Sequence, residues 1–436
     1  MNPFPLSARN QVLLLLVGLV LVLSGCAVNP VTGQSELALM QMSTEEEVSL
    51  GRQAFAQAQQ QSGGVWNEPG LIAYVDGVGQ RLARKSHRPD LKYHFTVVNE
   101  SSPNAFALPG GYIAITRGLL ANLSNEAELA AVLGHEIGHV TARHSLQGMQ
   151  RSSLLGVGVG LLGQLAGSSR YGDLATQVGG VAANLIDKRY SREQESEADR
   201  LGIDYMVRAG YDPVGAIQLQ EYFYREVEKG ADPQWLNGLF RSHPFSAERL
   251  AANRAYVAQY YPGIAGDGED AVAFAKAIES LSATRQGYAT YDQARKLEQQ
   301  GDLAAAIDRY HQALLEAPEQ PLILSSLGLA YLRQEDLVPA RRYLIKAINL
   351  QDDYYRSHLG LGYIYLQKEE SDKAREQLET GFKLLPTLEG GYLLAEAKER
   401  TGDNAGAREL YTAVAKADPG GKLGTNAALR LKNLGP

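Results

Sequence analysis

The chain has very little cysteine, with one residue, Cys26, among 436. A single thiol excludes an intrachain disulfide and a cysteine-based zinc site. A run of clustered Lys and Arg is also lacking. With 42 basic against 49 acidic residues the net charge is −7, which excludes the electrostatic footprint of a nucleic-acid-binding protein. Because 44% of the residues are hydrophobic and only 21% charged, global disorder is excluded, and the length predicts two or three domains.

The apolar run at residues 12–23 is too short to span a membrane, because such a helix rises about 18 Å against about 30 Å of hydrocarbon. We interpret residues 1–25 as a secretory signal peptide, with an uncleaved anchor as the alternative. Leu23-Ser24-Gly25-Cys26 resembles the lipobox of bacterial lipoproteins. This implies lipidation of Cys26 and a tether over residues 26–43. Ala27 in place of Asp favours the inner leaflet of the outer membrane, facing the periplasm.

Residues 44–262 mix helical and strand patterns and predict an α+β domain that is mostly helical with a small sheet. Residues 93–99 alternate as a strand does. The extended runs 105–108 and 112–116 are joined by Pro109-Gly110-Gly111, which predicts a hairpin.

A helix is predicted to begin at Asn125, whose spacing from Glu128 resembles a capping box, and to run to about Leu146. Apolar residues recur along it at three- and four-residue steps, which predicts one buried face: Leu129, Val132, Leu133, Ile137 and Val140.

This helix contains His135-Glu136-Ile137-Gly138-His139. Two histidines four residues apart lie one turn apart on one face, so both imidazoles can reach one ion. Glu136 lies between them and can take a proton from the attacking water, an arrangement typical of metalloproteases. The alternative is a helix that carries two exposed histidines and no ion.

A catalytic zinc needs a third protein ligand and an open fourth position. His144 is nine residues after His135, on the opposite side of a continuous helix, and is predicted to be an ordinary surface or packing residue. Glu195 and Asp199 are four apart, so one carboxylate can bind the metal while the other orients a ligating histidine. Glu193 and Glu197 have the same spacing. Spacing alone leaves both pairs open, although we favour a solvated face for the second pair.

His-Glu-x-x-His followed by Glu-x-x-x-Asp resembles the zinc peptidases related to the CAAX prenyl protease and HtpX, and in particular their periplasmic, BepA-like members. The resemblance implies a zincin-like fold and one zinc ion per chain, held by His135, His139 and Glu195. It also implies that Asp199 lies behind the ligands, where it is sometimes credited with donating a proton.

Two further segments resemble motifs of this family. The first is an edge strand that would align an extended substrate, formed by Asn104, Ala105, Phe106, Ala107 and Leu108. The second is His243-Pro244-Phe245-Ser246-Ala247-Glu248-Arg249. By resemblance, His243 approaches the zinc either as a transient fourth ligand that keeps the enzyme latent or as a transition-state donor. Arg249 would orient this segment or stabilise the oxyanion.

Beyond residue 284 the chain is nearly all helical and repeats itself. Alanines recur at steps of 34, 34 and 33 residues: Ala306, Ala340, Ala374 and Ala407. The pattern resembles the tetratricopeptide repeat and predicts an all-α solenoid at residues 285–436, after a helical linker at 263–284 and with a capping helix at about 422–434. Stacked repeats form a concave face that suits a protein partner.

Residues 148–186 are rich in glycine, and those at 154–167 carry no charge. We interpret this segment as a lid over the cleft. A membrane-seeking segment is the alternative, although fourteen residues cannot span a bilayer as a helix.

These features predict a periplasmic zinc endopeptidase that cleaves misfolded or stalled proteins. Resemblance to the BepA-like members implies that these are outer-membrane proteins, with the repeats docking on their assembly machinery. The alternatives are a chaperone or scaffold with a structural or latent zinc, and an inner-membrane lipoprotein that handles membrane substrates.

Overall fold

The computed structural model describes residues 26–28, 31, 33, 35–37, 42–154, 189–228, 242–264 and 271–435. The predicted signal peptide and most of the predicted lid, from residue 155 on, lie outside these ranges. Cys26 begins the short strand β1 (Cys26–Val28), which pairs antiparallel with β2 (Ser35–Leu37). Within the described ranges no helix is both long and apolar enough to cross a bilayer.

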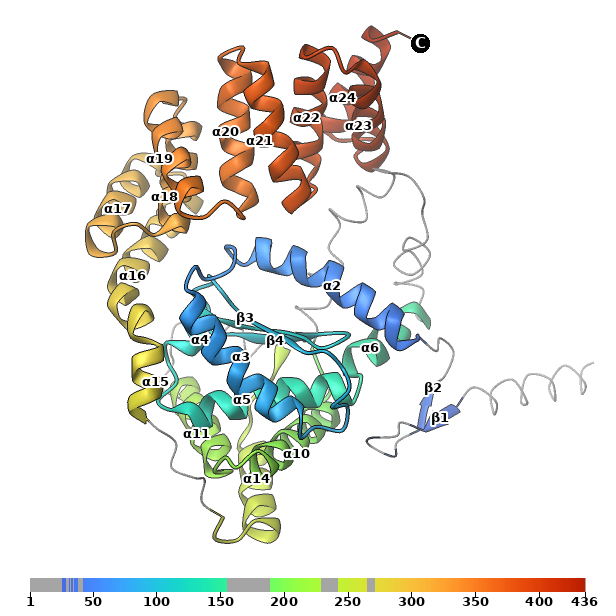
Figure 1. Ribbon diagram of the computed structural model, residues 1–436, viewed down its shortest axis with the longest axis vertical. Coiled ribbons are helices and arrows are strands. Elements are labelled where there is room, and N and C mark those ends of the chain that lie inside the picture. The colour runs from blue at the N-terminus through green and yellow to red at the C-terminus, as the bar shows by residue number, and fades with distance from the viewer. Residues whose placement is uncertain are drawn as a thin grey trace, which may run out of the picture.

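A three-stranded sheet lies at the centre of the first domain, in the order β3-β5-β4 (Figure 1). Strand β3 (His94–Val98) is parallel to β5 (Tyr112–Thr116), and β4 (Ala105–Leu108) is antiparallel to it. The predicted hairpin is therefore confirmed. Its turn contains Gly110 and Gly111 at φ +76° and +89°, a region that favours glycine. Strand β4 lies at an edge of the sheet, as the interpretation of residues 104–108 requires.

The two faces of the sheet are covered by different helices. One face packs against α2 (Thr44–Gln61) through Ala54, Phe55 and Ala58. The other face joins the main core, together with α3 (Pro69–Ala83) and α5 (Glu126–Thr141). Alternate strand residues therefore enter different cores, as the two-residue period of a strand dictates.

Helix α5 is almost wholly buried, and α6 (His144–Leu154), α10 (Arg192–Arg208) and α11 (Val214–Glu228) pack against it. Helix α14 (Ala247–Tyr260) packs on α10 and α11, and the short α4 (Arg117–Leu120) follows β5 directly. The predicted start of α5 is confirmed, since the Asn125 side chain accepts from the Glu128 N–H. The Glu128 carboxylate accepts from the N–H of Ser124.

The predicted continuation of this helix to Leu146 is wrong. Helix α5 ends at Thr141, Arg143 adopts φ +57°, and α6 begins at His144. A left-handed residue cannot continue a right-handed helix, so the chain changes direction there. This break changes where His144 points.

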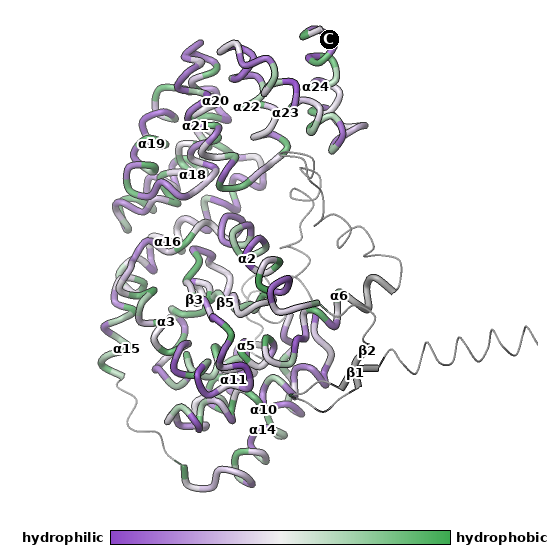
Figure 2. The backbone as a smooth tube through the Cα atoms, turned by 45° about the vertical axis from the view of Figure 1, so that its right-hand side comes forward, coloured by the Kyte–Doolittle hydropathy of each residue, from purple (hydrophilic) through white to green (hydrophobic). Residues whose placement is uncertain are grey.

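The second domain is the predicted helical solenoid, and Figure 2 shows hydrophobic and hydrophilic positions alternating along its helices. The repeated alanines at 306, 340, 374 and 407 are all fully buried between helices. The helices are α16 (Glu279–Gln299), α17 (Leu303–Glu316), α18 (Pro321–Arg333), α19 (Leu337–Leu350), α20 (Tyr355–Gln367), α21 (Ser371–Leu384), α22 (Leu388–Arg400), α23 (Asn404–Ala417) and α24 (Lys422–Asn433). Before them lies the short α15 (Ala271–Ala277), and the expected boundary at 284/285 falls inside α16.

The solenoid arches over α2 and contacts the first domain directly (Figure 1). Gln60 in α2 donates to the carbonyl of Asp353 at 2.6 Å and accepts from the N–H of Tyr355 at 2.9 Å. Nearby, the Arg117 guanidinium lies 3.7 Å from the centre of the Tyr288 ring. The two domains are thus joined by specific polar contacts.

Candidate metal centre

Helices α5 and α10 approach each other closely because small residues line their contact. A Cβ atom on Gly138 would lie 2.9 Å from the carbonyl oxygen of Ala198. A Cβ on Gly134 would lie 3.0 Å from the carbonyl oxygen of Gly202. The backbones can therefore meet, which brings the carboxylates of α10 to the histidines of α5.

Four side chains converge at this contact: His135, His139, Glu195 and His243 each offer one donor atom, all within 4.8 Å of one another. His135 Nε2 lies 3.0 Å from His139 Nε2 and 3.2 Å from His243 Nδ1. Glu195 Oε1 lies 3.5 Å from His139 Nε2 and 2.9 Å from His243 Nδ1. His139, Glu195 and His243 are buried.

These donors fit a tetrahedral ion. Ligands about 2.0–2.1 Å from such an ion lie about 3.3 Å from one another, which is within the range of separations at this site. Imidazole nitrogens that face one another repel through their lone pairs unless a proton or a cation lies between them. Two imidazoles and a carboxylate are also a donor set found in metallopeptidases.

The buried acids and histidines of the site shift one another's pKa. Burial alone would raise the pKa of Glu195, but His243, His139 and His135 hold it well below its ordinary value. Burial lowers the pKa of His139. The pKa of His243 is raised despite burial, because Glu195 and Glu136 lie beside it. Glu195 is therefore held as a carboxylate, the form that binds a metal ion.

Glu136 lies beside the four donors with an unused oxygen. It is 1% exposed, and its Oε2 has no hydrogen-bond partner among the described residues. Its Oε1 lies 3.5 Å from His243 Nε2. Burial raises the pKa of Glu136 above its ordinary value. A buried carboxylate with a free oxygen and a raised pKa is suited to accept and return a proton.

Asp199 lies behind His135, with Oδ1 2.9 Å from His135 Nδ1. It also accepts from Arg249 and from Asn253 Nδ2. Although burial raises the pKa of a carboxyl, Arg249 and His135 hold that of Asp199 far below its ordinary value. Asp199 is therefore a carboxylate that can orient the His135 ring.

Arg249 lies between the acids of the site. Its Nη1 is 2.7 Å from Glu195 Oε2 and donates to the carbonyl of Pro244 at 2.7 Å. The structure thus brings His243 and Arg249 to the predicted ligands, with Arg249 against the acids and against the segment that carries His243. Of the two acid pairs with equal spacing, Glu195 and Asp199 face this site.

His144 was predicted to be an ordinary surface or packing residue on the far side of one continuous helix, and both that placement and the surface location are wrong. It is fully buried, with Nδ1 2.9 Å from His139 Nδ1 and Nε2 2.9 Å from Glu197 Oε2. The favoured solvated role for Glu197 is corrected with it. The spacing argument failed because it assumed one continuous helix, whereas the chain turns at Arg143.

Tyr190 was also missed by the sequence analysis. Its ring stacks on that of His139 with centroids 3.9 Å apart, and its hydroxyl lies 3.1 Å from Ser145 Oγ. A tyrosine in the segment before the acidic helix carries no periodic signal that could have singled it out.

The residues expected to bind substrate lie in and beside edge strand β4. Ala105, Phe106, Ala107 and Leu108 are buried, and the Asn104 side-chain oxygen has no hydrogen-bond partner among the described residues. Ser145 Oγ lies 3.5 Å from the carbonyl oxygen of Ala107. Because these four side chains are buried, only main-chain groups of the strand could meet a substrate as the sequence analysis predicts.

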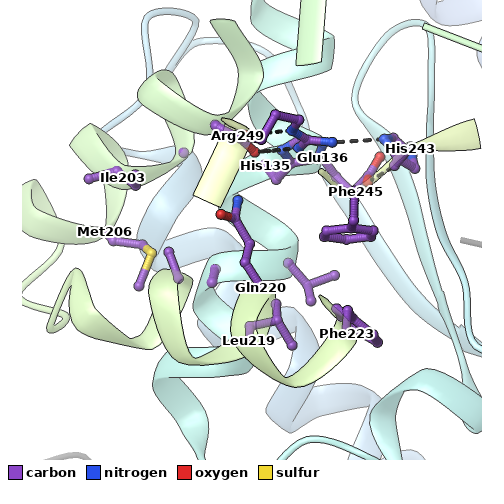
Figure 3. Close-up of a pocket in the computed structure, with 15 residues that line it drawn as sticks. His135, Glu136, Ile203, Met206, Leu219, Gln220, Phe223, His243, Phe245 and Arg249 are labelled. Atoms are coloured by element: carbon purple, nitrogen blue, oxygen red, sulfur yellow. Dashed lines mark hydrogen bonds and ion pairs between the residues drawn. The ribbon is translucent and has the colours of Figure 1, made fainter. Parts of the chain in front are cut away.

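A mostly apolar cavity of about 50 Å³ adjoins the site. Figure 3 shows His135, Glu136, His243 and Arg249 at one end, while Met206, Leu219 and Phe223 line the other. The cavity is far smaller than the pockets that hold whole organic ligands, so it offers room for a single small side chain beside the four donors.

A helix with His-Glu-x-x-His, a carboxylate from a second helix and a small mixed sheet are together typical of metallopeptidases of the His-Glu-x-x-His class. Residues 71–257 match peptidase family M48, and residues 291–348 and 359–422 match the tetratricopeptide repeat. The chain therefore contains an M48 metallopeptidase domain followed by tetratricopeptide repeats, and the family implies a metal cofactor.

Curated relatives agree with this assignment. The Beta-barrel assembly-enhancing protease of Escherichia coli (strain K12) is 32% identical over 212 residues, 47% of this chain and 42% of that protein. The protein of the same name from Yersinia pestis is 27% identical over 354 residues, 67% and 71% of the two chains. Mitochondrial metalloendopeptidase OMA1 of Arabidopsis thaliana is 35% identical over 168 residues, which are 38% of this chain and 32% of that protein. The chain thus matches about two fifths of the length of the Escherichia coli protein.

Solved structures similar to this chain include MamA from Desulfovibrio magneticus RS-1, at 15% identity, with a TM-score of 0.30 and coverage of 34% of this chain and 92% of that one. The first repeat domain of Spaghetti (RPAP3), bound to the HSP90 peptide SRMEEVD, is 19% identical with a TM-score of 0.27, covering 27% of this chain and 95% of that one.

Proposed function

We propose that this protein is a zinc-dependent endopeptidase whose metal is held by His135, His139 and Glu195. The supporting observation is the convergence of these three donors beside Glu136, whose buried Oε2 has no hydrogen-bond partner in the described part of the chain. When bound, zinc would supply Lewis-acid polarisation of a peptide carbonyl and a water molecule of lowered pKa.

Side chains of the site supply the proton transfer, hold the ligands in position and stabilise charge. Glu136 Oε2 accepts a proton from the attacking water and returns it to the leaving amine. Asp199 and Arg249 hold His135 and Glu195 in place through the contacts described above. His243 would stabilise charge that develops on the substrate, because its ring lies beside both Glu136 and Glu195, with Nε2 3.5 Å from Glu136 Oε1 and Nδ1 2.9 Å from Glu195 Oε1.

An extended substrate would add to β4, the edge strand of the sheet, through the main chain of residues 104–108. Selection then depends on accessible backbone more than on one side chain. Such a site suits misfolded or stalled proteins, whose backbone is not yet paired.

The biological setting that we propose is supported by the relatives' name, Beta-barrel assembly-enhancing protease. We propose that the substrates are unfolded or misassembled outer-membrane proteins and that the repeats dock on the assembly machinery. In this proposal residues 1–25 are a signal peptide, and Cys26 is lipidated and holds the protein in the periplasm at the outer membrane. Residues 26–43 form the tether, 44–262 the peptidase, 263–284 the linker and 285–436 the repeats. No nucleic-acid partner is proposed.

One observation favours a second candidate, a chaperone or scaffold whose zinc is latent. His243 Nδ1 lies within 3.2 Å of His135 and 2.9 Å of Glu195, where it can fill the fourth position that a catalytic zinc leaves open. In that case cleavage is not the protein's task in the cell.

The test is Glu136→Gln, which keeps size and removes the base. We expect unchanged zinc content by metal analysis and a loss of about 10²–10⁴-fold in the cleavage of an unfolded test protein. Cleavage that survives the substitution, or purified protein without metal, would refute the peptidase. An intact cellular phenotype in the variant would favour the chaperone.

A further inference from the structure

His144 has both ring nitrogens engaged inside the protein. Its Nδ1 lies 2.9 Å from His139 Nδ1, and its Nε2 lies 2.9 Å from Glu197 Oε2. His144 is 0% exposed, whereas the Glu197 side chain is 18% exposed. A chain of hydrogen bonds therefore runs from His139, through a buried imidazole, to a carboxylate near the surface.

The direction of these hydrogen bonds is set by the face that His139 turns to the metal site. Its Nε2 points to His135 Nε2 and to Glu195 Oε1. An imidazole that binds a metal through Nε2 carries its proton on Nδ1. His139 must then donate to His144 Nδ1, so the proton of a neutral His144 is on Nε2 and is donated to Glu197.

We propose that His144 and Glu197 are positioning residues that fix the ring orientation and the proton position of His139 for metal binding. This inference rests on the proposed metal site. In this arrangement His144 and Glu197 orient His139, the second histidine of the motif, as Asp199 orients His135, the first. The difference is that the Asp199 carboxylate contacts the His135 ring directly.

Helix geometry explains why His139 needs an intermediate residue. Glu195 and Glu197 are two residues apart on α10, so their side chains point about 200° apart around the helix. With Glu195 turned to the metal site, Glu197 points away from it. The imidazole of His144 bridges the distance that remains to His139.

The turn that presents His144 is held by a separate ion cluster. Arg143 takes its left-handed conformation while donating to Glu47 Oε2 at 3.2 and 2.8 Å. Arg88 also donates to Glu47, and its Nη1 donates to the carbonyl of Val140 in the last turn of α5. The position of His144 is therefore fixed by contacts outside the metal site.

Substituting His144 by Asn, Gln or Leu tests its contacts with His139 and Glu197 one at a time. Asn places a polar atom near the position of Nδ1 and can keep the contact with His139. Gln places one near Nε2 and can keep the contact with Glu197, while Leu keeps neither. A packing role would make all three equivalent in metal binding.

The measurement is zinc affinity, obtained by competition with a chromophoric chelator on the full chain. We expect His144→Leu and His144→Gln to weaken zinc binding by about 10–100-fold. His144→Asn, which can keep the contact with His139, should retain most of the wild-type zinc affinity. Glu197→Leu should weaken binding, whereas Glu193→Leu, an exposed acid on the same helix, should not. Equal affinities in all five variants would overturn the proposal.

A second measurement needs no substitution. In zinc-loaded protein with ¹⁵N-labelled histidine, NMR should find the His144 proton on Nε2, and a proton on Nδ1 would overturn the proposal. The two hypotheses fail separately. Wild-type protein that binds zinc without cleaving refutes the peptidase, while cleavage with unaltered zinc affinity in the variants refutes the role of His144.

Discussion

Arg249 donates to both carboxylate oxygens of Asp199, through Nε at 3.0 Å and Nη2 at 2.8 Å. Its third nitrogen, Nη1, reaches Glu195 and the carbonyl of Pro244. One guanidinium therefore joins α14 to α10 and to the segment of His243. The same side chain therefore contacts Glu195, Asp199 and the main chain next to His243.

Replacing Arg249 by Lys should lower peptidase kcat/KM and zinc affinity by about 10–100-fold, because an ammonium keeps the charge but cannot donate in a planar fork. The control is Arg254→Lys in the same helix, where an exposed arginine pairs with Glu221. If both variants behave alike, the geometry of the Arg249 guanidinium is irrelevant to the site.

Gly138→Ala should destabilise the protein by about 1–3 kcal/mol, because the added Cβ would meet the backbone of Ala198 at 2.9–3.0 Å. We expect a lower melting temperature and a lower zinc content, because the added Cβ would push α5 away from α10. Gly77→Ala, with open space around the added Cβ, should leave stability unchanged or raise it by up to about 1 kcal/mol. Equal effects of the two substitutions would argue against close packing at Gly138.

Glu47→Gln should lower the free energy of unfolding by about 1–3 kcal/mol at neutral pH. Burial would raise the pKa of Glu47, but Arg88 and Arg143 hold it below its ordinary value. The carboxylate therefore stabilises the fold fully above its ordinary pKa, and this stabilisation is lost as pH falls through the lowered pKa.

Urea unfolding across the acid range measures this dependence. The difference in the free energy of unfolding between wild type and Glu47→Gln should become smaller as pH falls. Glu45→Gln, a change at an exposed neighbour, should have the same free energy of unfolding as wild type at every pH. A difference that stays constant with pH would show that the charge of Glu47 is not its contribution.

Gln60→Leu should loosen the repeats from the first domain, because it leaves the carbonyl of Asp353 and the N–H of Tyr355 without these partners. The cost should be about 1–3 kcal/mol of docking free energy. Hydrogen exchange at the Tyr355 amide should accelerate in this variant and not in Gln53→Leu, an exposed position of the same helix. Unchanged exchange would contradict a structural role for the Gln60 contacts.

Much of the fold could be predicted because its signals are local. The hairpin at Pro109-Gly110-Gly111, the cap at Asn125 and the spacing of the buried alanines each depend on a few neighbouring residues. The two histidines of the motif and Glu136 were also found from one turn of helix.

What escaped prediction depends on contacts between distant residues. No residue near Arg143 in the sequence predicts its left-handed backbone conformation, because Glu47, the acid that holds it, is 96 residues away. Once the helix was extended past that point, His144 was placed on the wrong side. Equal spacing likewise left the acid pairs of α10 undecided until the helix was packed against α5.

Helix α2 begins beside the end of α5 and ends under the repeats. Glu47 fixes its first turn to Arg143, and Gln60, thirteen residues later, holds the loop before α20. The two anchoring points are about 20 Å apart along one rigid rod. Its length therefore sets the distance between these two contacts, one beside the end of α5 and one on the repeats, and one added helical turn would lengthen it by about 5.4 Å.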